Sequence, residues 1–266
     1  MPASEALLQA SQYLHLLQSV WWPFCRIMAV LLLAPVFNHK ALSTRARLLL
    51  GLILALALAP ALPPVVAVDV LSPAGVLLSL EQIAFGMLLG LALQLVFSVF
   101  TVVGELVSTQ MGMNMARIND PVNGVSSTSL VYQLYYVLLA LMFLAIDGHL
   151  LVVSVLFQSF SHWPVGSGFD YSGFESLVRA IGWLFSAALL LALPMVFCMI
   201  MVQFCFGLLN RISPAMNLFS LGFPITILVG LCCIYLTLPN MPTAYLQMTR
   251  ELLDSLAGML EARGHG

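Results

Sequence analysis

Charged residues divide this sequence into long uncharged stretches. No Asp, Glu, Lys or Arg occurs within residues 6–25, 48–68, 82–104, 121–146, 148–169, 180–210 and 212–249. A charge at the centre of a membrane helix costs about 2.5 to 3.5 kcal/mol, and about 20 apolar helical residues cross a bilayer core. The pattern therefore predicts apolar helices at residues 13–37, 48–68, 76–103, 129–160, 178–209 and 216–239.

The same pattern predicts an all-α fold, a membrane-type bundle of long broken helices and hairpins. Only helices and closed barrels satisfy backbone hydrogen bonds in lipid, and no short alternating strands occur here. Residues 178–209 would extend roughly 48 Å, longer than a bilayer core of about 30 Å. Segment 129–160 contains Asp147-Gly148-His149, so it forms either one overlong helix or two short halves. Overlong helices fit a bundle packed partly on other subunits, and the alternative is a tilted helix in an ordinary bundle.

Composition excludes a soluble protein. Hydrophobic residues make up 61% of the 266 residues and charged residues only 8%, where soluble domains carry about 25% charged residues. The mean hydropathy of +1.04 agrees with a membrane environment. A net charge of −2 argues against a nucleic-acid partner, because nucleic-acid binding requires clustered Lys and Arg.

Basic residues in short loops predict the orientation. The loops after the first, third and fifth segments carry Lys40, Arg45, Arg47, Arg117 and Arg211. Because cytoplasmic loops are enriched in Lys and Arg, we assign these loops to the cytoplasm and both termini to the periplasm. The tail at 243–263 is amphipathic and is expected to dock on a surface rather than to span the membrane.

No pattern of catalytic, metal-binding or nucleotide-binding residues stands out. The five cysteines lie in apolar segments without paired spacing, and no phosphate-loop or zinc-protease motif occurs. We therefore expect neither an enzyme nor a cofactor or metal site. Two alternatives stay open: an intramembrane serine protease that uses Ser126 and His149, and a small-solute transporter, although the two halves show no inverted symmetry.

The stretch at 104–124 is the most unusual part of the sequence. It places the polar residues Glu105, Gln110, Asn114, Asn119 and Asp120 beside Met111, Met113 and Met115. Irregular backbone at membrane depth is tolerated only where it is buried in protein or lines a cavity, and Met side chains adapt to varied shapes. The stretch therefore suggests a pore or gate. The alternative is a cytoplasmic loop whose Met side chains rest on the bundle.

A second polar stretch at 210–224 separates the last two apolar segments. Its residues include Asn210, Arg211, Ser213, Pro214, Met216, Asn217 and Phe219, followed by Ser220-Leu221-Gly222-Phe223-Pro224. The residue before a proline is disfavoured in helical conformation, so Ser213-Pro214 predicts a helical-hairpin turn.

Together these two stretches resemble the flagellar biosynthetic protein FliR family. The resemblance lies in Gly104-Glu105, Gln110-Met111-Gly112, Asp120-Pro121 and the turn from Asn210 to Pro224. It implies a core subunit of the type III export gate in the bacterial inner membrane, within the flagellar basal body. This subunit would help form and close the channel that passes unfolded flagellar proteins.

The resemblance also implies partners and an internal organisation. The partners are the FliP and FliQ subunits, an FlhB-type switch protein, the exported flagellar proteins and membrane lipid. Residues 1–176 would form a FliP-like part with a plug loop at 104–124, residues 177–240 a FliQ-like hairpin, and residues 241–266 the amphipathic tail. The 210–217 turn would face the cytoplasmic export machinery.

These expectations lead to a passive gate in which Met111, Met113 and neighbouring apolar groups exclude water and ions until substrate arrives. Energy would come from partner proteins, because the sequence has no nucleotide motif. The intramembrane charges Arg26 and Glu81 are expected to pair at subunit interfaces or within a helix, and a proton relay is the alternative role.

Overall fold

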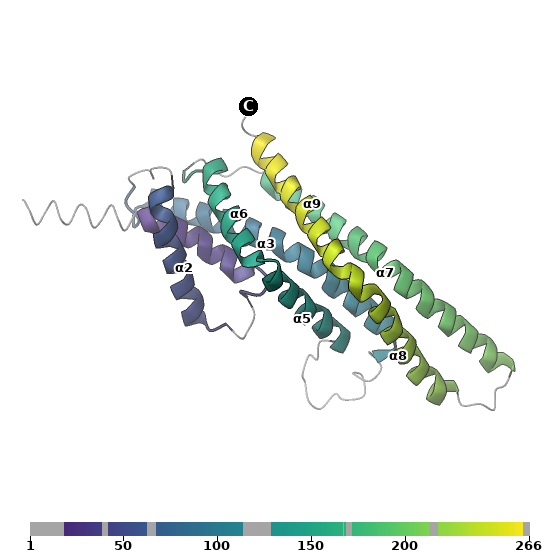
Figure 1. Cartoon of the computed structure of the whole chain (residues 1–266). Coiled ribbons are helices and arrows are strands. Elements are labelled where there is room, and N and C mark those ends of the chain that lie inside the picture. The colour runs from purple at the N-terminus through teal and green to yellow at the C-terminus, as the bar shows by residue number, and fades with distance from the viewer. Residues whose placement is uncertain are drawn as a thin grey trace, which may run out of the picture. The chain divides into compact units, whose positions relative to one another are not determined.

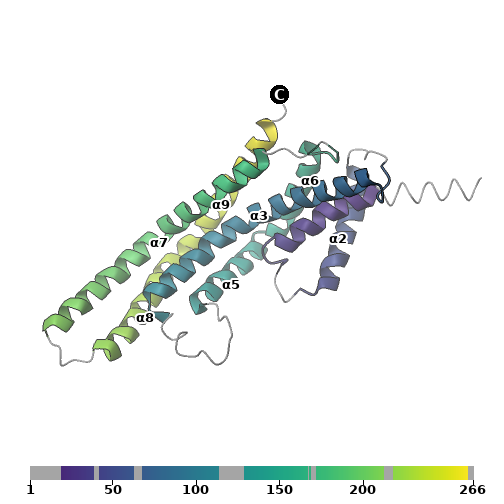
Figure 2. The ribbon, with the colours of Figure 1, turned by 180° about the vertical axis from the view of Figure 1, so that it is seen from behind.

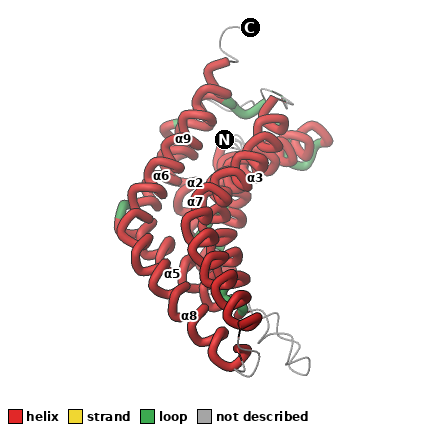
Figure 3. Tube along the Cα trace, turned by 90° about the vertical axis from the view of Figure 1, so that its right-hand side faces the viewer, coloured by secondary structure: helices red, strands yellow, loops and turns green. Residues whose placement is uncertain are grey.

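The computed structural model of the chain is described here for residues 19–38, 42–62, 68–113, 129–166, 168, 172–212 and 218–262. The helices are Ser19–Leu33, α2 (Thr44–Leu58), η1 (Ala59–Ala61), α3 (Pro73–Gln110), α5 (Leu130–Ala145), α6 (Gly148–His162), α7 (Ser172–Ile212), α8 (Leu218–Thr237), η2 (Leu238–Asn240) and α9 (Met241–Ala262). The described part of the chain contains helices and connecting loops without strands, as Figure 3 shows. The predicted all-α fold is confirmed.

Four of these helices are long and apolar enough to cross a membrane, or five if the bent pair α5 and α6 forms one span. The sequence pattern predicts six segments. The described part of the first segment, Ser19–Leu33, is shorter than a bilayer span requires. The spans include Val178–Ile212 and the stretch Gly222–Leu252, which runs through η2 into α9.

The break at Asp147 resolves the two alternatives for segment 129–160. The segment forms two helices, α5 and α6, which meet at an angle of 71°. Asp147 adopts a left-handed conformation with φ of 56°, and any side chain at Gly148 would collide with the ring of Phe143. The left-handed residue and the close contact together end α5 and turn the chain into α6.

Helix α3 is longer than the sequence pattern predicts. Residues 104–110, which we expected to begin a loop, are its last two turns, because the polar residues after Gly104 are compatible with a helix and no proline interrupts it. The helix ends at Gln110, and Gly112 two residues later has a φ of 75°, the left-handed conformation common after a helix C-terminus. The backbone N–H of Gly112 donates to the carbonyl of Thr109 at 3.0 Å.

The chain folds into two compact units that do not follow sequence order. The first unit comprises residues 1–94, 143–179 and 252–266, and the second comprises residues 95–142 and 180–251. The division expected from the resemblance, at residues 176 and 240, is sequential and stays a prediction.

In the first unit, the helix Ser19–Leu33 packs on the beginning of α3 (Figure 2). A side chain at Gly86 would meet the backbone of Arg26 and the Cβ of Ala29, and one at Gly90 would meet Leu33. These two glycines therefore allow the helices to approach closely.

In the second unit, residues 180–212 of α7 lie beside α8, and Figures 1 and 2 agree on this arrangement. Phe97 and Phe100 of α3 pack against Tyr245 of α9, with ring centroids 5.9 and 6.2 Å apart.

Candidate functional site

The end of α3 is fixed to α8 by a close fit between Met111 and Gly230. Met111 is 1% exposed, and a Cβ added at Gly230 would lie 2.5 to 2.9 Å from three of its side-chain atoms. Only glycine therefore leaves room for the methionine. The hydroxyl of Thr226, one turn earlier on α8, donates to the carbonyl of Met111 at 3.4 Å.

A second contact fixes the same helix end to α7. The side-chain amide of Gln203 donates to the carbonyl of Gln110 at 2.9 Å and to its side-chain oxygen at 3.3 Å. The next glycine, Gly112, faces the ring of Phe223 on α8. We call the group Gln110, Met111, Gly112, Gln203, Thr226 and Gly230 the loop anchor. It holds the point where the chain leaves α3 against both helices of the α7–α8 pair.

The other predicted loop residues divide into two sets. Gly104 packs against the backbone of Tyr132 on α5, and Glu105 is half-buried on α3. Met113 is half-buried just after the helix end. Four further predicted residues lie outside the described part of the chain: Asn114, Met115, Asp120 and Pro121. The structure thus brings Gln110, Met111 and Gly112 together with residues of α7 and α8.

The predicted hairpin turn is described at its two ends. Asn210 and Arg211 are exposed at the end of α7, where a basic side chain interacts favourably with the helix dipole. Phe219 belongs to α8. The residues between the helices, namely Ser213, Pro214, Met216 and Asn217, lie outside the described part.

Arg26 forms a buried polar cluster in the first unit. Its Nε donates to the side-chain oxygen of Gln82 at 2.9 Å. Nη1 donates to the carbonyl and hydroxyl oxygens of Ser159 at 3.0 and 3.2 Å, and Nη2 donates to the carbonyl of Trp163 at 2.8 Å. Because these carbonyls lie at the end of α6, the guanidinium caps that helix and interacts favourably with its dipole.

Aromatic rings complete this cluster. The guanidinium carbon lies 4.1 Å from the centroid of Phe160 and 5.4 Å from that of Phe85, which itself stacks on Trp163 at 4.9 Å. Arg26 is 0% exposed. This chain alone covers the side chain completely, and the expected place of Arg26 at a subunit interface stays a prediction.

Glu81 lies beside this cluster on α3. It is half-buried, accepts from the amide of Gln82 at 3.5 Å and interacts electrostatically with Arg26. Its role at a subunit interface and the alternative role in a proton relay stay predictions.

Sequence reasoning missed the partners in both clusters. Gln203 is an isolated polar residue in the apolar run Met199–Leu209, which is a recognisable signal for a hydrogen bond between helices. Gly230, Ser159 and Trp163 carried no such signal, because their roles depend on residues distant in the sequence. Of the pair considered for a protease, Ser126 lies outside the described residues, and His149 lies at the start of α6. Among the described residues, no group of His, Cys, Asp and Glu could hold a metal ion.

Long apolar helices and an anchored connection between them define a helical membrane protein. A family model described as bacterial export proteins, family 1, matches residues 17–252. The chain therefore belongs to this family of bacterial export proteins.

Named relatives agree with this assignment. The chain is 38% identical to the flagellar biosynthetic protein FliR of Pectobacterium carotovorum subsp. carotovorum over 241 residues, which cover 90% of this chain and 92% of the relative. It is 30% identical to the FliR of Escherichia coli K12 over 252 residues, which cover 94% and 96%. It is 26% identical to the FliR of Bacillus subtilis over 243 residues, which cover 86% and 92%. The resemblance to the FliR family is confirmed, and the chain is a component of the flagellar protein export apparatus.

Proposed function

We propose that this protein is a core subunit of the export gate in the bacterial inner membrane. It helps form and close the channel through which unfolded flagellar proteins leave the cytoplasm. Its partners are FliP, FliQ and an FlhB-type protein, and both of its termini face the periplasm. The loop anchor is the observation that carries the proposal, because a gate requires a closing segment with a fixed base.

In this mechanism the loop anchor positions the segment that follows Gly112, and that segment closes the channel. Met111 serves as part of the base, because its side chain is buried against Gly230. Closure is passive, and partner proteins supply the energy for transport.

The apolar faces of α7 and α8 support membership in a larger assembly. Within the most apolar window of Val178–Ile212, only 22% of the residues are buried in the chain. The buried share of the corresponding window is 11% for Gly222–Leu252 and 67% for α3. Such surfaces require cover from lipid or from neighbouring subunits.

The test combines secretion and purification. Deleting the gene is expected to abolish secretion of flagellar subunits into the medium, and the tagged full chain is expected to co-purify with FliP and FliQ. The proposal fails if secretion continues without the gene. It also fails if the chain is recovered from membranes only as an isolated protein while secretion is normal.

A further inference from the structure

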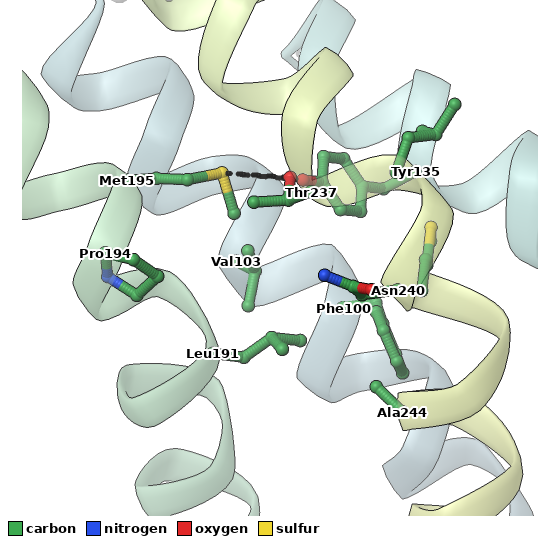
Figure 4. A pocket seen from close by; sticks show the side chains of 11 residues that line it. Phe100, Val103, Tyr135, Leu191, Pro194, Met195, Thr237, Asn240 and Ala244 are labelled. Carbon is green, nitrogen blue, oxygen red and sulfur yellow. Dashed lines mark hydrogen bonds between the residues drawn. The ribbon is translucent and has the colours of Figure 1, made fainter.

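A pocket of about 170 Å³ lies in the second unit, between α3, α5, α7 and the junction of α8 with α9 (Figure 4). Pro194 of α7 and the 3-10 turn η2 both lie at this pocket. Pro194 removes a backbone donor within α7, and η2 separates α8 from α9. The pocket thus lies where α7 lacks one backbone hydrogen bond and where α8 gives way to α9.

The interior of the pocket is suited to an apolar occupant. The hydroxyls of Tyr135 and Thr237 both donate to the sulfur of Met195, at 3.8 and 3.7 Å. The Thr237 hydroxyl also lies 3.0 Å from the carbonyl of Cys233. A buried water requires two to four polar partners, and these groups already have partners within the chain. An apolar cavity of about 150 Å³ can hold benzene, so this pocket accommodates a group of similar width.

The pocket is closed at its inner end and open at its mouth. Phe100 and Val103 on α3 form the inner wall and are 1% and 0% exposed. Pro194, Leu238 and Asn240 are exposed at the mouth. Around it, α7 and α8 carry exposed apolar side chains such as Leu190, Leu193, Leu228, Leu231 and Leu236. An apolar chain arriving from the membrane can therefore reach Phe100 and Val103 through a mouth that carries apolar side chains beside the polar Asn240.

From this geometry we infer that the pocket binds the acyl chain of a membrane phospholipid. The hydrocarbon tail packs against Phe100 and Val103, and the amide of Asn240 at the mouth offers a donor for an ester carbonyl. The site binds lipid whether or not the chain acts in export, so it goes beyond the proposed function.

The test uses cells that make the full chain and incorporate fatty acids with a diazirine near the tail into phosphatidylethanolamine. After irradiation, mass spectrometry maps the lipid adducts. Adducts are expected on Phe100 and Val103, because lipid reaches these buried side chains only through the pocket. Adducts confined to exposed faces of α7 and α8 would overturn the inference.

Two pocket variants and one control variant sharpen this test. Ala244→Phe fills the pocket and is expected to lower labelling of α3 about tenfold, which corresponds to about 1.4 kcal/mol. Ala145→Phe adds the same ring at an exposed position of α5 and should leave labelling unchanged. Asn240→Leu keeps the pocket apolar, removes the donor and is expected to lower labelling about fivefold. This variant tests the inference independently if Ala244→Phe does not accumulate. Undiminished labelling of Phe100 and Val103 in both pocket variants would contradict the assignment.

Discussion

The Arg26 cluster and the loop anchor both join distant parts of the chain, but they differ in chemistry. Arg26 makes four charge-assisted hydrogen bonds and lies between aromatic rings, without contact to solvent. The loop anchor relies on the fit of Met111 against Gly230 and on neutral hydrogen bonds from Gln203 and Thr226. Hydrogen bonds to charged groups contribute about 1.5 to 3 kcal/mol each, whereas neutral ones contribute about 0.5 to 1.5 kcal/mol.

This difference implies that the Arg26 cluster is rigid, whereas the loop anchor can rearrange. Breaking the Arg26 cluster would leave several buried polar groups unpaired, so its rearrangement is costly. The loop anchor can rearrange at lower cost, because methionine is flexible and Gln203 is exposed. A contact that can rearrange is suited to the base of a gate. Variants of Arg26 should therefore affect folding, and variants of the anchor should affect closure.

The largest loss of stability is expected from Arg26→Leu. The substitution removes the donors to Gln82, Ser159 and Trp163, and each buried acceptor left unpaired costs about 1 to 3 kcal/mol. The amount of full-length protein in membranes and its thermal stability should fall sharply. Arg45→Leu, at an exposed position of α2, is the matched control and should leave both unchanged. Normal stability of the Arg26→Leu variant would contradict the view that the Arg26 cluster stabilises the fold more than the loop anchor does.

Gly230→Leu is expected to lower stability less than Arg26→Leu does and to impair closure of the channel more. The added side chain occupies the space of Met111, and overpacking of this kind costs about 1 to 3 kcal/mol. The assembled complex should become leaky to ions while the chain still accumulates. Gly207→Leu adds the same side chain where nothing lies within 4 Å in this chain.

A double variant tests whether this effect passes through Met111. Met111→Ala removes the side chain that Gly230→Leu displaces, so the two substitutions together should be less harmful than their separate effects predict. Strict additivity of the two changes in thermal stability would show that the residues do not act as a pair.

The smallest effect on stability and on closure of the channel is expected from Gln203→Leu. The substitution removes the hydrogen bond to the carbonyl of Gln110, worth about 0.5 to 1.5 kcal/mol. A modest increase in ion leak through the complex is expected, with unchanged protein amount. Gln247→Leu on α9, whose amide bonds to Glu251, is the control. A loss of stability as large as that of Arg26→Leu would contradict the distinction between the Arg26 cluster and the loop anchor.

The apolar helices could be predicted from the sequence because charges are expensive in lipid, so their spacing outlines the segments. The contacts between the helices could not be predicted from the sequence. Arg26 was recognisable as a charge in an apolar segment, but its partners lie 56 to 137 positions away. The end of α3 was also misplaced. Polar residues such as Glu105 and Gln110 suggested a loop, yet the helix continues to Gln110 and the left-handed Gly112 follows its end.

The central claim is that the segment anchored after α3 closes the channel. The most direct test deletes residues 113–120, just beyond the loop anchor, and measures ion flux across membranes that contain the assembled complex without substrate. The account predicts a large ion leak through a complex that still assembles with FliP and FliQ. A fully assembled complex that remains as tight to ions as the unaltered one would contradict it.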